Sequence, residues 1–432
     1  MERIPTTQLA AHAGEQIRLA GWLHRFRQFG SIGFLIVRDG FGLAQVVVDN
    51  PTLIAQLAAL PSESVLEIEG EAVAAEQAPG GIEVRASRVA VIAEASAPPP
   101  FDLFRPALPA QRPTILDHAS VALRHPRHRA MFRLQATSVK GFRATLDSLG
   151  FVEVHTPKIV ASATESGANV FTIDYFGRPA YLAQSPQFYK QIMVGVFERV
   201  YEVGPVFRAE PHDTPRHLNE YVSLDVEMGF ITDHRTVMGV LTDVIRGMLQ
   251  ALEAETRTIA LLDVRLPAVP ERIPEIHFSD ALALISDDTG EDVRAEIDLA
   301  PVHERWLGEW AEREYHSDFL FVTGYPMRKR PFYTHPDPAS PEYSNSFDLI
   351  FRGLELVTGG QRLHRYADYL SALEARGQDS APLGGYLEAF KYGMPPHGGF
   401  ALGLERWVAQ LTGASNVRET TLFPRDLNRI TP

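Results

Sequence analysis

Hydrophobic and polar residues alternate along five short runs near the start of the chain, as they do in half-buried β-strands. The turn sequences DGFG at residues 39–42 and APGG at residues 78–81 separate two pairs of these runs. Residues 51–60 instead have apolar positions at helical spacing. The N-terminal region is therefore expected to be a small β-barrel with a helix after its third strand. The five runs are residues 15–26, 33–39, 43–49, 64–74 and 81–93.

A proline-dense stretch, residues 96–113, cannot form a regular helix or a central strand, so it predicts a domain boundary. Apolar residues at helical spacing follow, up to Gly150, and then strand and helix patterns alternate to the end of the chain. We expect an N-terminal domain at residues 1–97, a hinge at residues 98–127 and an α+β domain at residues 128–432. An inserted segment with no assigned role is expected around residues 265–340.

The composition is that of an ordinary globular protein, with 45% hydrophobic and 22% charged residues among 432. The chain has no cysteine, which excludes disulfides and thiolate metal sites and favours a reducing cytoplasm. Neither a secretory signal nor an apolar stretch of about 18 residues is visible, so no membrane association is expected.

The net charge of −13 argues against a nucleic-acid partner, but the charge is unevenly distributed. Between residues 16 and 48 four arginines face a single aspartate, and five aromatic residues lie among them. This pattern is compatible with a solvated strand face over an ordinary core. It is also typical of an OB-fold, a partly open five-stranded barrel that binds single-stranded nucleic acid through aromatic stacking.

Three further segments together resemble the signature motifs of class II aminoacyl-tRNA synthetases. Residues 150–159 are similar to motif 1, which implies a homodimer with Pro157 at the interface. Residues 200–230 are similar to motif 2, and residues 391–407 to motif 3. The resemblance implies a catalytic domain built on an antiparallel sheet flanked by helices.

The same resemblance implies roles for the residues in these motifs. Arg208 and Arg406 are the expected catalytic residues, because fixed guanidinium groups can hold the phosphate oxygens on which charge develops. Glu355 and Thr358 are expected to hold Mg²⁺, which takes few protein oxygens beside phosphate and water. The remaining expected ATP-binding residues are Glu210, Arg216, His217, Leu218, Gly403, Leu404 and Glu405.

Residues 184–191 (QSPQFYKQ) and the C-terminal tail resemble the short, archaeal-type aspartyl-tRNA synthetases. A buried substrate carboxylate needs cations, and the resemblance implies Lys190 and Arg362 as a two-point clamp for it. Asp225 and Glu165 are the implied partners of the substrate ammonium. Gln187, Arg208 and Thr358 complete the expected aspartate site.

The resemblance also implies that the barrel binds the anticodon of tRNA-Asp and, because it favours a relaxed specificity, that of tRNA-Asn; a discriminating enzyme that charges only tRNA-Asp is the alternative. Phe34 and Gln45 would stack on and hydrogen-bond the central base, and His24 and Pro79 would lie near the third. Three alternatives remain open: an asparaginyl-tRNA synthetase, an ammonia-dependent asparagine synthetase, and a non-catalytic tRNA-binding paralogue. The residues expected along the anticodon backbone are Arg25, Arg27 and Gln28.

Overall fold

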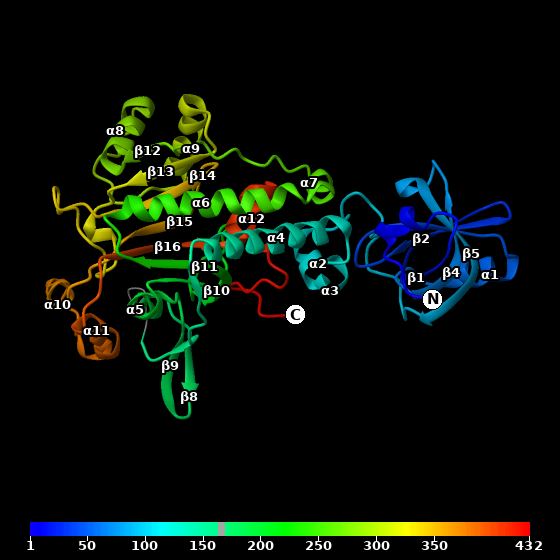
Figure 1. The fold of residues 1–432 in the computed structure, drawn as a ribbon, viewed down its shortest axis with the longest axis horizontal. Coiled ribbons are helices and arrows are strands. Elements are labelled where there is room, and N and C mark those ends of the chain that lie inside the picture. The colour runs from blue at the N-terminus through cyan, green and yellow to red at the C-terminus, as the bar shows by residue number, and fades with distance from the viewer. Residues whose placement is uncertain (163–168) are drawn as a thin grey trace. The chain divides into compact units, whose positions relative to one another are not determined.

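In a computed structural model, which describes residues 1–162 and 169–432, the chain divides into two compact units, Met1–His128 and Arg129–Pro432. The first unit contains a closed five-stranded barrel with strand order β1-β2-β3-β5-β4 (Figure 1). Its inward-facing residues, such as Leu19, Leu35 and Val46, form one buried cluster. The expected five strands and the helix after the third are confirmed. Their bounds are β1 (Gln16–Phe29), β2 (Ile32–Arg38), β3 (Leu43–Val48), α1 (Pro51–Ala59), β4 (Val65–Ala74) and β5 (Ile82–Ala93).

Short helices complete the first unit. Two 3₁₀ turns, Thr6–His12 and Pro79–Gly81, flank barrel strands. Two short α-helices follow, and the first begins in the last two residues of the proline-dense stretch, where a proline is tolerated in the first helical turn. Asn50 caps α1 by accepting hydrogen bonds from the backbone N–H groups of Thr52 and Leu53, which explains where that helix begins. The two helices are α2 (Arg112–Asp117) and α3 (Ala119–Ala122).

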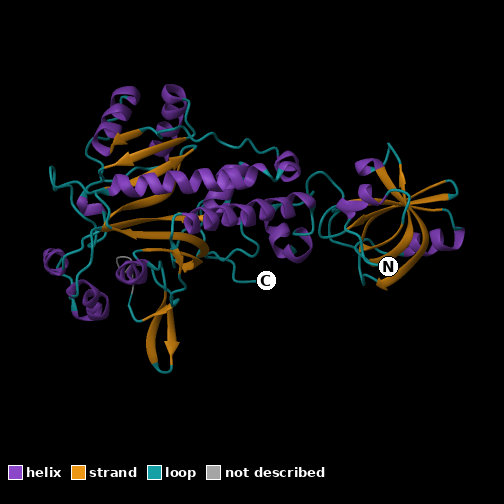
Figure 2. Ribbon diagram, in the orientation of Figure 1, coloured by secondary structure: helices purple, strands orange, loops and turns teal. Residues whose placement is uncertain are grey.

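The second unit is built on an eight-stranded sheet with the order β12-β13-β14-β15-β16-β11-β10-β6, and its strands pair antiparallel except at β12–β13 and β10–β6 (Figure 2). The expected α+β class is therefore confirmed. The strands are β6 (Val152–Glu153), β10 (Arg199–Phe207), β11 (Glu220–Gly229), β12 (Glu275–His277), β13 (Phe319–Thr323), β14 (Ser346–Phe351), β15 (Leu354–Gln361) and β16 (His397–Gly403). A separate three-stranded sheet contains β7 (Ile159–Val160), β8 (Thr172–Tyr175) and β9 (Arg178–Leu182).

Helices α4 and α6 lie side by side along one face of the large sheet (Figures 1 and 2). Gly141 of α4 allows this contact, since an added Cβ would lie 2.7 Å from the Cα of Met248. Trp407 of α12 also packs in this core and donates a hydrogen bond to Ser138. The helices of this unit are α4 (Pro126–Ser148), α5 (Gln187–Phe197), α6 (His234–Glu253), α7 (Thr256–Leu262), α8 (Phe278–Thr289), α9 (Pro301–Tyr315), α10 (Tyr366–Ala375), α11 (Gly384–Lys391) and α12 (Leu404–Thr412).

Strand alternation gives the sheet one apolar and one polar face. On β11, Leu224, Val226 and Met228 belong to the core beneath the helices. The residues between them, Asp225 and Glu227, therefore point to the opposite face. That face holds the candidate site.

Candidate active site

A cavity of about 460 Å³ lies on the polar face of the large sheet. The register Asp225↔Ala401↔Thr358 brings β11, β16 and β15 together at its base. Most residues expected from the sequence line it, although they come from segments up to 219 residues apart. These are Gln187, Arg208, Glu210, Arg216, His217, Leu218, Asp225, Glu355, Thr358, Arg362, Gly403, Glu405 and Arg406.

Two expected site residues stand apart from this cavity lining, and a third is not among the described residues. Lys190 and Leu404 are buried and do not line it. Glu165 lies outside the described residues. Pro157, expected at a dimer interface, follows β6, and its role stays a prediction.

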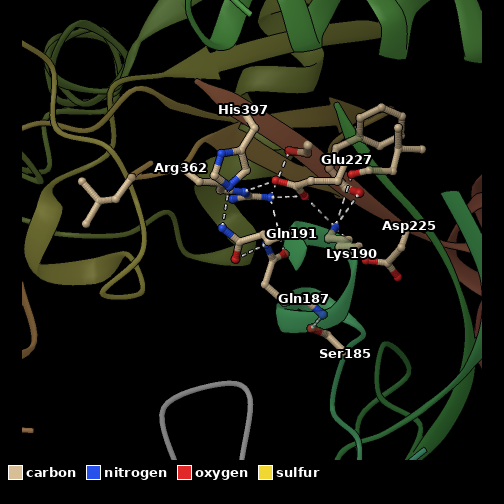
Figure 3. Close-up of polar contacts among 12 residues, drawn as sticks. Ser185, Gln187, Lys190, Gln191, Asp225, Glu227, Arg362 and His397 are labelled. Atoms are coloured by element: carbon tan, nitrogen blue, oxygen red, sulfur yellow. Dashed lines mark hydrogen bonds and ion pairs between the residues drawn. The ribbon is translucent and has the colours of Figure 1, made fainter. Parts of the chain in front are cut away.

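Lys190 lies beneath the cavity, where its ammonium group is surrounded by oxygen atoms of the protein (Figure 3). It comes from the first turn of α5, and its side chain is only 1% exposed. Its Nζ donates to Asp225 Oδ1 at 2.9 Å and to the carbonyl of Phe400 at 3.2 Å. A second carboxylate, Glu227 Oε2, lies 3.4 Å away. Lys190 therefore balances two buried carboxylates, and its direct contact with a substrate stays a prediction.

Glu227 is a site residue that the sequence analysis missed. Its carboxylate accepts a hydrogen bond from Arg362 Nε at 3.0 Å, so one carboxylate joins the two cations (Figure 3). Burial alone would raise the pKa of Glu227, but the charges of Arg362 and Lys190 lower it below its ordinary value. The spacing of Asp225 and Glu227 in the strand was the available signal, because residues i and i+2 share one face.

Gly399 leaves room for this carboxylate. A Cβ added at this position on β16 would lie 2.3 Å from Glu227 Oε2 and 2.0 Å from the carbonyl oxygen of Val226. Any side chain there would displace the carboxylate or the strand. We call Lys190, Asp225, Glu227 and Arg362 the charged floor of the cavity.

A buried polar network supports the charged floor from the side of α5. Arg362 donates to the carbonyl of Gly399 at 3.1 Å and lies 3.5 Å from Gln187 Oε1. Gln187 donates to Gln191 Oε1 at 3.0 Å, and Gln191 Nε2 lies 2.9 Å from His397 Nε2 (Figure 3). Burial lowers the pKa of His397 to about 4, so this imidazole is neutral at pH 7. The network fixes the orientation of Gln187 and Arg362 at the cavity wall.

The other end of the cavity carries charges that remain accessible to solvent. The side chains of Arg208, Glu355 and Arg406 are 39%, 37% and 30% exposed. Arg406 donates to the backbone carbonyl of Glu355 at 3.3 Å, and its Nη1 lies 3.8 Å from Glu355 Oε1. We call these three residues, with Glu210 and His217, the polar rim. It can hold a charged, elongated ligand such as a triphosphate.

Several side-chain oxygen atoms that could bind a metal ion lie close together near Glu355 of the polar rim. Thr358 Oγ1 lies 3.3 Å from Glu355 Oε1, and Asp348 on β14 pairs in register with Thr358. Burial raises the pKa of Asp348 to about 6; Arg330, at 2.9 Å, opposes this shift, and Glu355 adds to it. Among the described residues, no three acidic, histidine or cysteine side chains form a metal-binding cluster. A sparse set of hard oxygens nevertheless fits Mg²⁺ shared with phosphates.

Residues 265–340, to which the sequence analysis gave no role, contribute to the cavity. Arg330, Tyr333 and Thr334 line it. Glu304 of α9 accepts a hydrogen bond from Arg216 at 2.7 Å and another from the backbone N–H of Glu355 at 2.8 Å. This buried carboxylate therefore ties a loop residue to a strand of the sheet.

In the barrel, pairing in register places Arg27 beside Phe34 and Arg25 beside Ile36, which pairs with Gln45. Gln45 donates to Glu83 at 3.0 Å. The guanidinium groups of Arg25 and Arg27 lie 4.4 and 5.6 Å from the ring centre of Phe104. Gln28 is exposed near the end of the same strand. The strands thus bring the expected backbone-binding and base-stacking residues onto neighbouring positions.

The structure does not bring His24 and Pro79 together. A β-bulge after Leu23 makes Leu23 and His24 consecutive buried residues, and His24 Nδ1 lies 3.5 Å from the buried Glu63. β4 begins beside this end of β1, at Val65, whereas Pro79 follows the far end of β4. The expectation that both lie near the third anticodon base stays a prediction.

Within the part of the chain that the structure describes, no helix is both long and apolar enough to span a bilayer.

Comparison with known proteins places both units in characterised families. Residues 111–427 match the family of class II tRNA synthetases (D, K and N), and residues 17–92 match the OB-fold nucleic acid binding domain. The chain is 47% identical, over 100% of both sequences, to the aspartate–tRNA(Asp/Asn) ligase of Thermus thermophilus. It is 44% identical to the ligase of the same name from Aeropyrum pernix, over 97% of this chain and 96% of the other.

Solved structures agree with the sequence relatives on the fold. The chain superimposes on the asparaginyl-tRNA synthetase of Pyrococcus horikoshii in complex with asparaginyl-adenylate, with a TM-score of 0.92, 30% identity and 100% coverage of both chains. The match to residues 111–427, together with the full-length relatives, shows that the chain belongs to the class II tRNA synthetases of the D, K and N group and carries an N-terminal OB-fold.

Proposed function

We propose that the protein is an aspartate–tRNA ligase that charges both tRNA-Asp and tRNA-Asn. It would activate L-aspartate with ATP to aspartyl-adenylate and release pyrophosphate, and then transfer the aspartyl group to the 3′ end of the tRNA with release of AMP. Full-length relatives that are 47% and 44% identical bear the name aspartate–tRNA(Asp/Asn) ligase. The charged floor is the observation that carries the choice of amino acid.

Aspartate would bind with its side chain toward Arg362, which lines the cavity, and its ammonium toward Asp225. Lys190 would act from beneath: it neutralises Asp225 and Glu227, so that the floor does not repel an incoming carboxylate. Without Lys190 the floor would hold two carboxylates against one guanidinium. Gln187 would fix the orientation of the substrate.

ATP would occupy the polar rim. The α-carboxylate of aspartate attacks the α-phosphorus, the bond to the pyrophosphate oxygen breaks, and pyrophosphate leaves. Arg208 and Arg406 would hold the oxygens on which charge increases. The nucleotide would be held by Glu210, Arg216, His217 and Leu218 together with Gly403–Glu405, where β16 ends and α12 begins. Glu355 and Thr358 would hold Mg²⁺, which neutralises phosphate charge when bound.

The barrel would bind the anticodon, with Phe34 stacking on a base and Gln45 contacting its edge. Arg25, Arg27 and Gln28 would follow the phosphate backbone. Their positions on adjacent strands support this role. The proposed assembly is a homodimer with Pro157 at the interface, and the proposed place of action is the cytoplasm, where tRNA is charged for translation.

An asparaginyl-tRNA synthetase is the second candidate. The Pyrococcus horikoshii structure favours it through its high structural likeness. Glu227 also favours it, because a carboxylate in the floor could accept the amide N–H of asparagine. The pairing of Glu227 with two cations argues against this use, since both sides of the carboxylate are already engaged.

ATP–pyrophosphate exchange with aspartate and with asparagine separates the two candidates. We expect exchange with aspartate alone, because Arg362 can form a charge-assisted hydrogen bond with a substrate carboxylate but only a weaker, neutral one with an amide oxygen. Aminoacylation of transcribed tRNA-Asp and tRNA-Asn then tests the relaxed specificity. Exchange with asparagine alone would overturn the aspartate assignment, and charging of tRNA-Asp alone would overturn the relaxed specificity.

A further inference from the structure

The segment that follows α12 lies against the loop that joins β10 to β11. The backbone N–H of Val417 donates to the carbonyl of Pro215 at 2.9 Å, and the N–H of Asn219 donates to the carbonyl of Arg425 at 2.8 Å. Val417 also packs against Leu218 in a small buried cluster. Two points of the loop are thus fixed to residues about 200 positions later in the chain.

Arg418 is the centre of this contact. Its side chain is 8% exposed and reaches the loop twice, with Nη2 donating to Asp213 Oδ1 at 2.8 Å and Nη1 to the carbonyl of Thr214 at 3.0 Å. Nε donates to Asp426, on the C-terminal segment itself. Asn428 binds the second oxygen of Asp213 at 3.0 Å. A buried guanidinium with this many partners holds both segments in one arrangement.

The loop carries part of the polar rim. Thr214, whose carbonyl Arg418 binds, also contacts His217 Nδ1 through its hydroxyl at 2.6 Å. Arg216 and His217 both line the cavity. Residues 208–219 contain no helix or strand, so ordering each one costs about 1–2 kcal/mol of backbone entropy. The loop therefore needs contacts from outside itself to stay in place.

We propose that Arg418 is a positioning residue for nucleotide use: through Asp213 and Thr214 it holds Arg216 and His217 at the ATP end of the cavity. The charged floor lies on β11, on α5 and directly after β15, and contains no residue of this loop. Arg418 should therefore govern the use of ATP while leaving the recognition of aspartate unchanged. This inference rests on the proposed ligase function.

The test measures ATP–pyrophosphate exchange with Arg418→Ala and Arg418→Lys in the full chain. Displacing a positioned group by about 1 Å can cost about 100-fold, so we expect kcat/KM for ATP to fall about 10- to 100-fold in Arg418→Ala. KM for aspartate should stay within about twofold, because the charged floor lies outside the loop. Arg418→Lys should restore part of the loss, since an ammonium reaches one acceptor but lacks the fork.

Asp213→Asn serves as a second variant in case Arg418→Ala does not fold. Asp213 is 55% exposed, so its substitution does not threaten the core, and we expect kcat/KM for ATP to fall about two- to tenfold through loss of a charge-assisted bond. Arg257→Ala, on the exposed surface of α7, is the matched control and should change neither constant.

Two results would overturn the proposal: unchanged ATP kinetics in a folded Arg418→Ala, or an equal rise in KM for ATP and for aspartate. If Arg418→Ala does not fold, unchanged ATP kinetics in Asp213→Asn would overturn it too. If the wild-type protein shows no exchange with aspartate, the proposed function fails first, which makes the two failures distinguishable.

Discussion

The two ends of the cavity use charge in opposite ways. In the charged floor, Lys190, Asp225 and Glu227 are at most 2% exposed, and each ion pairs with another member. At the polar rim, Arg208, Glu355 and Arg406 are about one-third exposed, with ion-pair distances of 3.8–3.9 Å. Burial fixes the floor before any ligand arrives, whereas the rim stays hydrated and can adjust to phosphates. Rigid charge suits selection of one amino acid, and solvent-accessible charge suits the binding of phosphates, which replace the water there.

The largest expected effect comes from Lys190→Met. This change leaves Asp225 and Glu227 without the ammonium between them, and breaking a buried ion pair costs about 3–5 kcal/mol. We expect a loss of stability of that size in denaturant unfolding, together with at least about a 100-fold loss of aspartate-dependent exchange. Lys140→Met on the exposed side of α4 is the control and should change stability by less than about 0.5 kcal/mol. Equal stability of the two variants would show that the floor is not a closed charge network.

Arg406→Ala should separate catalysis from stability at the rim. Removing one group that stabilises developing charge costs about 100- to 1,000-fold in kcat, which pyrophosphate exchange measures. The free energy of unfolding should change by about 0.5 kcal/mol or less, because the side chain is partly hydrated and its ion pair is long. A loss of stability as large as that of Lys190→Met would remove the contrast between the two ends.

Glu405 provides a third comparison, since it is a buried carboxylate at the nucleotide end. Burial raises the pKa of Glu405 to about 7. The hydrogen bonds that Glu405 accepts from the backbone N–H of Val222 lower the pKa, but by less than burial raises it. A raised carboxyl pKa means that the folded state binds the proton more tightly than the unfolded state. The contribution of Glu405 to the free energy of unfolding is therefore fully present below pH 4.5 and is lost as the pH rises through about 7.

Glu405→Gln should abolish this dependence. Relative to wild type, the variant should gain on the order of 1–3 kcal/mol of stability between pH 4.5 and pH 7.5. Urea unfolding across this range is the measurement. If the difference in unfolding free energy between wild type and Glu405→Gln did not change with pH, the raised pKa of Glu405 would be contradicted.

Salt should give the smallest effect. Raising ionic strength from about 0.1 M to about 1 M shortens the screening length from about 10 Å to about 3 Å. The hydrated rim should respond more than the buried floor, so KM for ATP should rise several-fold more than KM for aspartate in exchange assays. If KM for ATP and KM for aspartate rose by the same factor, the rim and the floor would not differ in their exposure to solvent.

The fold followed closely from the pattern of the sequence. The five barrel strands and the helix at residues 51–59 were predictable because one face of each element is buried against one core. The long helix before Gly150 was predictable for the same reason, and the backbone of Gly150 has a φ of +78°, which favours glycine. The spacing of apolar residues within a segment is enough to predict such a helix or strand, because it does not depend on which distant segment the element packs against.

The site was predictable only where resemblance supplied the residues. Lys190 was expected to hold the substrate, but pairing between β11 and β16 decides that its ammonium faces Asp225, Glu227 and a carbonyl of β16. Glu304 lies in a segment with no motif, and it reaches Glu355 only because α9 packs against the sheet. The burial of His24 directly after Leu23 could not be predicted, because a β-bulge shifts the alternation by one residue and no period-two pattern reveals it.

Gly399 limits how this protein could be re-engineered for a longer amino acid. Glycine is already the smallest residue, and an added Cβ at this position would meet Glu227 and the carbonyl of Val226 on the neighbouring strand. The cavity therefore cannot be enlarged for glutamate at Gly399, and a shorter side chain in place of Gln187 on α5, which lines the cavity, is one way to enlarge it. That substitution would also break its bond to Gln191, so design of a new specificity must rebuild both glutamines together.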